Sequence, residues 1–526
     1  MTEDSSKTAL PRRNWPVWAQ RLGLPVAMAA LGAVQSLAFV YTGAWALPLL
    51  CLAVLVWLLN GATPLRAALL GWCYGTGWLV AGVWWLFISM HRYGELPAPL
   101  AAAAVWALSA FLSLYLAAAA GLYARWRRGV WLPDACLFAA LWLLAEWARG
   151  VWFTGFPWVA LGYSQVDAPL AGLAPWLGVY GVAAVLALAA AVLGNLACVA
   201  SRLRPTLVAA VVAALTLPGV FGPGQFTHSA GLLSVTLLQT NVAQDQKFVA
   251  EQLPATLAWV ASALLQVQAG LVVTPETAVP LLPEQLDDVA PGYWLALRQH
   301  FNHPGVAALV GVPLGNFERG YTNSVVGLKA AADADYRYDK HHLVPFGEFI
   351  PSGFRWFTDM MNIPLGDFAR GVLVPPTFDV GGQRIAPNIC YEDLFGEELA
   401  ARFVGPAPAP TVLANVSNMA WFGAGTAIAQ HLNISRFRSL ELQRPMVRAT
   451  NTGATAAIDH HGRVIAQLPV ATQGVLTVNV EGREGNTPYA AWAGRWGLWP
   501  LVVLATGVLV WAVALRPSAM DRVDTR

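Results

Sequence analysis

The sequence predicts a polytopic α-helical membrane domain of about eight spans, joined to a polar domain in which strands alternate with helices. Two observations lead to this prediction. Hydrophobic residues make up 56% of the 526-residue chain and charged residues only 12%, whereas about a quarter of the residues in a soluble globular protein are charged. The acidic residues are also unevenly spread. Residues 5–230 contain only Glu95, Asp134, Glu146 and Asp167, while residues 231–485 have an ordinary polar composition.

Apolar runs long enough, or nearly long enough, to cross a bilayer about 30 Å thick follow one another along the first part of the chain. With one further run near the C-terminus, they cover residues 24–40, 44–60, 66–90, 97–123, 131–148, 170–200, 205–222 and 496–515. The first run resembles a signal peptide, but a second apolar segment follows it closely, which favours a retained span. We expect a transmembrane domain at 1–225, a polar domain at 231–485, and a last span with its tail at 490–526.

Arginines are concentrated in alternate loops between these runs. They precede the first run and follow the second, fourth and sixth, as Arg12, Arg13, Arg21, Arg66, Arg125, Arg127, Arg128, Arg202 and Arg204. Such loops face the cytoplasm by the positive-inside rule. Seven spans then place residues 231–485 on the extracytoplasmic side. The eighth returns the basic tail, with Arg516, Arg522 and Arg526, to the cytoplasm.

The polar domain shows the pattern of an α/β or layered α+β fold. Strands are expected where Val, Leu, Ile and Thr cluster between Gly, Pro or Asn, at 232–242, 270–279, 306–314, 322–328, 384–391, 411–417, 446–451, 454–458 and 475–480. Helices are expected at 248–268, 283–301, 394–403 and 426–443. The segment Asp459-His-His-Gly462 is typical of a hairpin turn.

Three residues close extended segments of the polar domain and offer complementary chemistry. Cys390 stands where an apolar strand meets a helix, and Glu276 and Lys340 end two other extended segments. A thiol at a helix start near cations is expected to ionise readily, a carboxylate acts as a general base, and an ammonium stabilises an oxyanion. From the residues alone, a buried structural thiol and a plain turn glutamate remain alternatives.

Residue usage supports a special role for Lys340 and limits other functions. The chain relies on arginine and has only four lysines, Lys7, Lys247, Lys329 and Lys340, and only lysine provides a compact ammonium with an adjustable pKa.

The net charge of +2 gives no sign of a nucleic-acid partner. Adjacent His341 and His342 would point to opposite faces of a strand, which disfavours a metal site. The four other cysteines lie in apolar segments without metal-ligand spacing.

Three motifs resemble the signatures of the nitrilase superfamily, the carbon-nitrogen hydrolases: Thr274-Pro-Glu276, Lys340-His-His-Leu-Val-Pro-Phe-Gly-Glu348 and Asn388-Ile-Cys390-Tyr-Glu392. That superfamily has an αββα sandwich fold and a Glu, Lys, Cys triad. Further segments along almost the whole chain resemble one membrane branch, the apolipoprotein N-acyltransferase family. They are Glu146–Gly150, Thr154–Trp158, Leu161–Ser164, Asn415–Asn418, Trp421–Gly423, Gln430-His431, Arg448–Gly453 and Thr487–Tyr489.

The resemblance implies transfer of an acyl chain from a membrane phospholipid to the N-terminal amine of the diacylglyceryl-cysteine of a bacterial apolipoprotein. It implies no cofactor and no metal, and a location in the bacterial inner membrane with the catalytic domain on the periplasmic side. Cys390 would be the nucleophile that forms a thioester, Glu276 the base and Lys340 the oxyanion stabiliser. Supporting positions would be Glu348, Tyr391 and Glu392, and substrate-binding positions Asn418, Trp421 and Phe422.

The chain departs from the family pattern at two positions outside the triad. Met419 stands where Asp usually follows Ser-Asn, and Phe248 stands in a region where Trp is expected. The nearest alternative function is a membrane-tethered nitrilase-type amidase, in which water resolves the thioester. A transporter is disfavoured because the spans hold few ionisable residues, chiefly Asp134, Glu146 and Arg149. The intact Glu, Lys, Cys set argues against a non-catalytic sensor.

Overall fold

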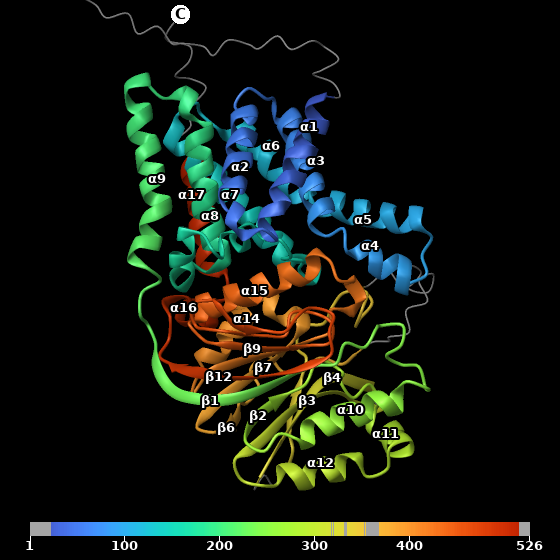
Figure 1. Ribbon diagram of the computed structural model, residues 1–526. Helices are drawn as coiled ribbons and strands as arrows, with labels where there is room; N and C mark the ends of the chain where they lie inside the picture. The colour runs from blue at the N-terminus through green and yellow to red at the C-terminus, as the bar shows by residue number, and fades with distance from the viewer. Residues whose placement is uncertain are drawn as a thin grey trace, which may run out of the picture.

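The computed structural model describes residues 23–514, except 317, 319, 331–333, 352 and 354–367. A bundle of apolar helices lies against a sandwich of two β-sheets (Figure 1). The arginines at 12, 13 and 21, Lys7, and the basic tail with residues 516, 522 and 526 lie outside the described residues.

The bundle contains the helices encoded by the apolar runs. They are α1 (Leu24–Gln35), α2 (Ala46–Leu59), α3 (Pro64–Gly82), α4 (Leu86–Ile88), α5 (Ala98–Leu112), α6 (Leu114–Trp126), α7 (Trp131–Val151), α8 (Ala174–Gly194), α9 (Arg204–Phe221) and α17 (Trp499–Ala514). Within the described residues, five helical segments are long and apolar enough to span a membrane, or seven if each of two bent pairs counts as one span. The segment Leu24–Phe39 is a shorter apolar helix.

The predicted number of eight spans is therefore not confirmed for the part of the chain that the structure describes. Hydropathy treats 66–90 as one run, yet the helix axis bends by 64° between Pro64–Gly82 and Leu86–Tyr93. Another bend, of 85°, separates α16 (Pro488–Trp496) from α17. Mean hydropathy over a window does not detect such bends, because they change the direction of the chain and not its polarity.

The polar region folds into two six-stranded mixed sheets. The first sheet has the order β12-β1-β2-β3-β4-β5 and the second the order β11-β10-β9-β8-β7-β6. The strands of the first are β1 (His228–Gln239), β2 (Gly270–Val273), β3 (Val306–Asn316), β4 (Gly320–Lys329), β5 (Tyr336–Asp339) and β12 (Gly474–Glu484). Those of the second are β6 (Phe378–Val380), β7 (Gln383–Ile389), β8 (Val412–Ser417), β9 (Met446–Thr450), β10 (Ala456–Ile458) and β11 (Val464–Gln467).

All nine predicted strands are confirmed, although several differ in length. Three short strands were not among them, β5, β6 and β11. The predicted helix at 283–301 is two helices, α11 (Pro283–Val289) and α12 (Tyr293–Phe301). They are separated at Gly292, which has a φ of +79°. The predicted hairpin turn at 459–462 is confirmed, since β10 and β11 pair antiparallel across it.

Helices cover both outer faces of the sheet pair, which confirms the αββα sandwich expected from the resemblance. On one side, α10 (Leu253–Leu265), α11 and α12 cover the first sheet. On the other, α14 (Gly396–Ala400), α15 (Thr426–Leu442) and α16 lie between the second sheet and the membrane bundle (Figure 1). The apolar side chains of the two inner faces form a separate core between the sheets. The second sheet is thus the layer nearer to the bundle.

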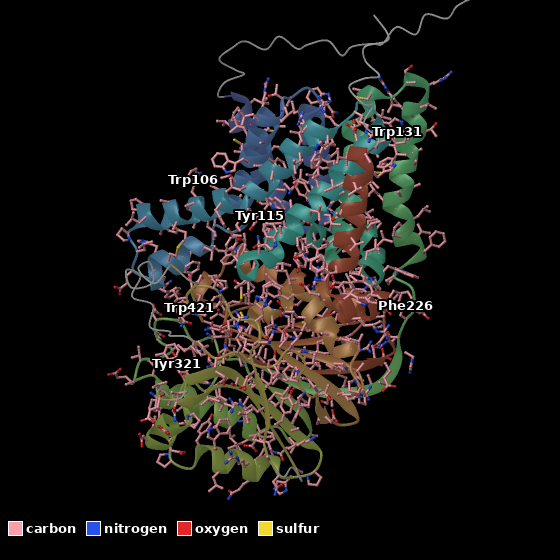
Figure 2. All side chains as sticks on the ribbon, turned by 180° about the vertical axis from the view of Figure 1, so that it is seen from behind. Trp106, Tyr115, Trp131, Phe226, Tyr321 and Trp421 are labelled. Atoms are coloured by element: carbon pink, nitrogen blue, oxygen red, sulfur yellow. The ribbon has the colours of Figure 1, made fainter. Side chains whose placement is uncertain are left out.

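Buried polar contacts join the bundle to α15. The Gln430 side-chain oxygen accepts hydrogen bonds from the indoles of Trp85 at 3.0 Å and Trp158 at 2.8 Å. Its amide nitrogen donates to the carbonyl of Gly82 at 3.0 Å. Figure 2 shows Trp421 at the same junction, with Trp106 and Tyr115 on the bundle side. The end of α3 is therefore fixed directly to α15.

Close packing of α1 on α3 generates the first prediction. A β-carbon built on Gly77 of α3 would lie 1.9 Å from the carbonyl oxygen of Ala29 on α1. Small residues at such positions let membrane helices approach closely. We expect Gly77→Ala to destabilise the bundle by about 1–3 kcal/mol, the usual cost of overpacking, and to lower the thermal unfolding midpoint in detergent. Gly43→Ala, where no atom lies within 4 Å of the added carbon, is the control. Equal midpoints for the two variants would contradict the packing argument.

Candidate active site

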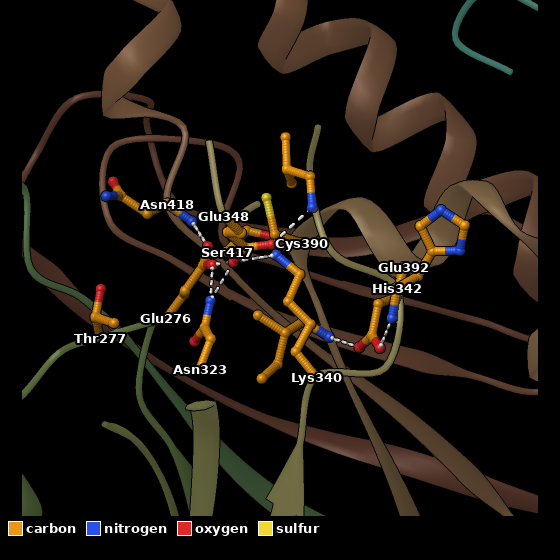
Figure 3. A network of polar contacts seen from close by, with 12 residues as sticks. Glu276, Thr277, Asn323, Lys340, His342, Glu348, Cys390, Glu392, Ser417 and Asn418 are labelled. Atoms are coloured by element: carbon orange, nitrogen blue, oxygen red, sulfur yellow. Dashed lines mark hydrogen bonds and ion pairs between the residues drawn. The ribbon is translucent and has the colours of Figure 1, made fainter. Parts of the chain in front are cut away.

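The structure brings Glu276, Lys340 and Cys390 together at one edge of the sandwich (Figure 3). Glu276 follows β2 and Lys340 follows β5, both in the first sheet, whereas Cys390 follows β7 in the second sheet. The Lys340 Nζ lies 3.6 Å from Glu276 Oε1. Cys390 lies close enough to both for the charges of Glu276 and Lys340 to act on its thiol. Two sheets therefore contribute to one set of side chains.

The backbone at two of these turns is held in the left-handed region. Cys390 has a φ of +53° and Thr277, next to Glu276, has a φ of +47°. A non-glycine residue in this region costs on the order of 1–3 kcal/mol and is kept only where the surrounding structure enforces it. At Cys390 the turn leads from β7 into a short 3₁₀-helix, Cys390–Leu394, and α14 begins only at Gly396. The strand-to-helix turn expected from the sequence is present in this tighter form.

A second glutamate completes the polar centre. Glu348 Oε1 lies 2.8 Å from Lys340 Nζ, and its other oxygen accepts from the backbone nitrogen of Val344 at 2.8 Å. The Asn323 amide nitrogen donates to Glu276 Oε1 at 2.7 Å and to Glu348 Oε1 at 2.8 Å. Lys340 is 1% exposed. One buried ammonium and one amide thus hold two carboxylates in fixed positions.

The charges set the ionisation of the lysine and the thiol. Burial alone would lower the pKa of Lys340, but Glu348 and Glu276 raise it well above its ordinary value. Burial, together with Glu276, raises the pKa of the Cys390 thiol, and Lys340 only partly opposes this effect. The expectation that a helix start and nearby cations would favour ionisation of the thiol is therefore wrong, because the site raises the pKa of Cys390.

Glu392 ties the nucleophile turn to the lysine loop. One carboxylate oxygen accepts from the backbone nitrogen of Ile389 at 2.6 Å and from the Tyr338 hydroxyl at 2.5 Å. The other oxygen accepts from the backbone nitrogens of His341 at 2.7 Å and His342 at 3.2 Å. Residues just before Cys390 and just after Lys340 therefore share one buried carboxylate, which fixes the two sheets relative to each other at the site.

Tyr391 faces the membrane bundle. Its hydroxyl donates to the carbonyl of Gly155 at 3.0 Å, and its ring packs against those of His342 and Phe395. Asn418, after β8, contributes through its backbone, because its N–H donates to Glu276 Oε2 at 2.8 Å. The Asn418 side chain instead bonds to Gln244 and Asn451.

The predicted substrate-binding aromatics lie at the junction of the sandwich with the bundle. Trp421 packs edge-on against Tyr93, with ring centroids 5.7 Å apart, and Phe422 packs against Trp85 at 4.5 Å. Met419 is buried against Gly453, so the position where the family has Asp is apolar and enclosed here. Phe248 at the other departure is half exposed.

Lys247 is a neighbour of the site to which sequence reasoning gave no role. Its Nζ donates to the Glu276 carbonyl at 3.1 Å and to the Thr277 hydroxyl. Burial lowers the pKa of Lys247 to about 8. The scarcity of lysine in this chain is the signal that could have identified Lys247 from the sequence. Its contacts hold the Glu276 turn in its left-handed conformation.

A second buried group lies behind Cys390. Asp393 accepts from His431 Nε2 at 2.9 Å and from Arg448 at 3.0 Å, and His431 also contacts the Cys390 carbonyl at 3.2 Å. Since Arg448 donates to His431 Nδ1, Nε2 carries the ring proton. Burial would raise the pKa of Asp393, but His431 and Arg448 bring it below its ordinary value. Sequence reasoning did not identify this group, because Asp393, His431 and Arg448 are far apart in the chain.

Comparison with known proteins agrees with this geometry. Residues 31–192 match the family model described as apolipoprotein N-acyltransferase N-terminal domain, and residues 234–489 match that of carbon-nitrogen hydrolase. The chain is 52% identical to the apolipoprotein N-acyltransferase of Verminephrobacter eiseniae, covering 98% of this chain and 99% of that one. This chain belongs to the apolipoprotein N-acyltransferase family. It is also 47% identical to the Ralstonia nicotianae member, over 95% and 94% of the two chains. For the Bordetella bronchiseptica member the values are 43%, 96% and 98%.

The contacts of Glu392 generate the second prediction. Glu392→Gln leaves one acceptor oxygen, whereas four donors bond to the carboxylate. The amide nitrogen of the glutamine would face two of those donors and could not accept from them. A buried polar network that loses its ionised partner is destabilised. We expect about 1–3 kcal/mol of lost stability, measured as a lower thermal unfolding midpoint in detergent. Glu251→Gln, at an exposed position, is the matched control. An unchanged midpoint for Glu392→Gln would show that the contacts of the Glu392 carboxylate are not needed for stability.

Proposed function

We propose that this protein transfers an acyl chain from a membrane phospholipid to the α-amino group of the diacylglyceryl-cysteine at the start of an apolipoprotein. The observation that carries the proposal is the assembly of Glu276, Lys340 and Cys390 around one buried polar centre, in a chain that belongs to the apolipoprotein N-acyltransferase family.

In the first half-reaction, Cys390 Sγ attacks the ester carbonyl carbon of the phospholipid. A free thiolate formed before the attack would be a buried negative charge beside two carboxylates, so Glu276 takes the thiol proton as the sulfur attacks. Lys340 remains a cation and stabilises the oxyanion of the tetrahedral intermediate. The ester C–O bond then breaks, Glu276 returns the proton to the leaving oxygen, and a thioester and a lysophospholipid result.

In the second half-reaction, the neutral α-amine of the apolipoprotein attacks the thioester. A C–N bond forms, the C–S bond breaks, and the proton lost by the amine passes through Glu276 to the sulfur of Cys390. Lys340 stabilises the second oxyanion as it did the first. Glu348 and Asn323 keep the lysine and the base in place through their hydrogen bonds. A thioester held away from water favours attack by the amine.

The surrounding residues fit this reaction. Glu348 and Glu392 support the lysine and the nucleophile turn, and Tyr391 joins that turn to the bundle. We propose that Trp421 and Phe422, which pack on residues of the bundle, lie where the acyl chain approaches. Asn418 would act on the substrate only indirectly, because its backbone N–H is bound to Glu276.

We further propose the membrane arrangement predicted from the arginine-bearing loops. Domains at 1–225 and 490–526 would span the bacterial inner membrane eight times, and residues 231–485 would lie on the periplasmic side. Both proposed substrates are anchored in lipid. The second sheet and its helices, which carry Cys390, lie next to the bundle, and this position would bring the nucleophile close to the membrane surface.

The acyl-enzyme provides the third prediction. Incubation with phospholipid alone should give one acyl group on Cys390 and one lysophospholipid per enzyme, and then stop. Mass spectrometry of the intact protein measures the adduct. Adding a diacylglyceryl-cysteine peptide with a free amino terminus should discharge it, whereas the acetylated peptide should not, because an amide is a poor nucleophile.

Two variants test the assignments within the same assay. Cys390→Ser should carry no acyl group, because a hydroxyl ionises far less readily than a thiol. Lys340→Arg keeps the charge but replaces a compact ammonium with a planar fork, and acyl-enzyme formation should fail. Steady release of free fatty acid from the wild-type protein without an amine would instead support the amidase alternative, in which water resolves the thioester.

Membrane orientation is the subject of the fourth prediction. A reporter fused after Gly222, or inserted near Pro408, should be extracytoplasmic, and one fused after Arg526 should be cytoplasmic. Alkaline phosphatase, which is active outside the cytoplasm, and green fluorescent protein, which fluoresces inside it, give opposite readouts for each fusion. Fluorescence from the Gly222 fusion would reject the arrangement.

A further inference from the structure

His342 connects three parts of the molecule through one buried side chain. Its Nδ1 lies 2.9 Å from Glu398 Oε1 on α14, and its Nε2 lies 3.0 Å from the carbonyl oxygen of Thr154, on the loop that follows α7. Its backbone N–H donates to Glu392. The ring also stacks on Phe395, with centroids 3.5 Å apart and planes 16° apart. These contacts leave the ring little freedom to rotate.

Both partners of the ring are oxygen atoms that accept hydrogen bonds, a carboxylate oxygen of Glu398 at Nδ1 and the backbone carbonyl of Thr154 at Nε2. Glu397 lies next to Glu398 on α14, and burial together with Glu398 raises the pKa of Glu397 to about 7.

The loop that accepts the bond has an unusual backbone. Phe153, Thr154 and Gly155 have φ values of +54°, +73° and +80°. A β-carbon on Gly155 would lie 2.0 Å from the Gly150 carbonyl, so only glycine fits there. This conformation lets two successive carbonyls reach the catalytic domain, that of Thr154 to His342 and that of Gly155 to Tyr391.

These two bonds end next to catalytic positions. His342 lies two residues after Lys340, and Tyr391 follows Cys390 directly. The loop at 152–156 therefore contacts both the lysine loop and the nucleophile turn, while His342 is the side chain that also links it to α14.

We propose that His342 is a positioning residue for acyl-enzyme formation. It holds the Lys340 loop between α14 and the loop at 152–156, so that the ammonium stays in place for the oxyanion without His342 touching the substrate. The inference rests on the proposed function, since it concerns the step in which Cys390 takes the acyl group.

The test measures single-turnover acylation of Cys390 by phospholipid in mixed micelles, in purified full-length protein. For His342→Gln we expect the maximal rate to fall by about 10- to 100-fold, because a displacement of about 1 Å at a catalytic group costs up to about 100-fold. The phospholipid concentration that gives half the maximal rate should not change. The thermal unfolding midpoint of the variant in detergent should match that of the wild type, which shows that the variant is folded.

Two variants of Glu398 add a graded readout. Glu398→Gln keeps an acceptor oxygen for Nδ1 and should retain most of the rate, whereas Glu398→Ala removes the acceptor and should lose more. His342→Gln combined with Glu398→Ala should be no slower than His342→Gln alone, because both changes act through one contact. The control is His300→Gln, since His300 also contacts a backbone carbonyl, that of Val267, but lies on α12 in the outer layer.

The outcomes separate the inference from the proposed function. If wild-type protein forms no acyl-enzyme with phospholipid, the proposed function fails. If wild-type protein acylates and His342→Gln matches it within twofold, only the positioning role is overturned. A rate loss in proportion to the fraction of unfolded protein, or a change confined to the half-maximal phospholipid concentration, also overturns it.

Discussion

A single buried ammonium organises the polar centre. Lys340 lies between Glu276 and Glu348, and Asn323 bonds to both carboxylates. Removing one partner from a buried pair leaves an uncompensated charge, at a cost of about 3–5 kcal/mol. The loops that carry these residues are therefore held in one arrangement. Burial, and after it the negative charge of Glu276, also raises the pKa of the Cys390 thiol.

The centre also depends on the contact between the two sheets. Lys340 and Glu276 come from the first sheet and Cys390 from the second, so any slip of one sheet over the other would separate them. Glu392 opposes such a slip, because it binds the backbone on both sides of the gap. The apolar core between the sheets provides the larger contact area, and Glu392 fixes the local register.

The second sheet, which carries Cys390, is the sheet that lies nearer to the membrane bundle. Buried contacts from Gln430 and Tyr391 reach the ends of bundle helices and loops. The nucleophile turn is therefore fixed to the part of the protein that would sit in the bilayer. A soluble enzyme with the same triad would not require this connection, whereas an enzyme acting on two lipid-anchored substrates would.

The sequence by itself determined the two-part architecture, the nine strands it predicted and the residues of the centre. Composition and strand periodicity are local properties, and the three motifs around Glu276, Lys340 and Cys390 are short and specific. Only the tertiary structure decided the bends in the apolar segments, the state of the thiol, and the partners Asn323, Lys247 and Asp393. Those properties depend on burial and on charges from residues far away in the chain, which no local pattern records.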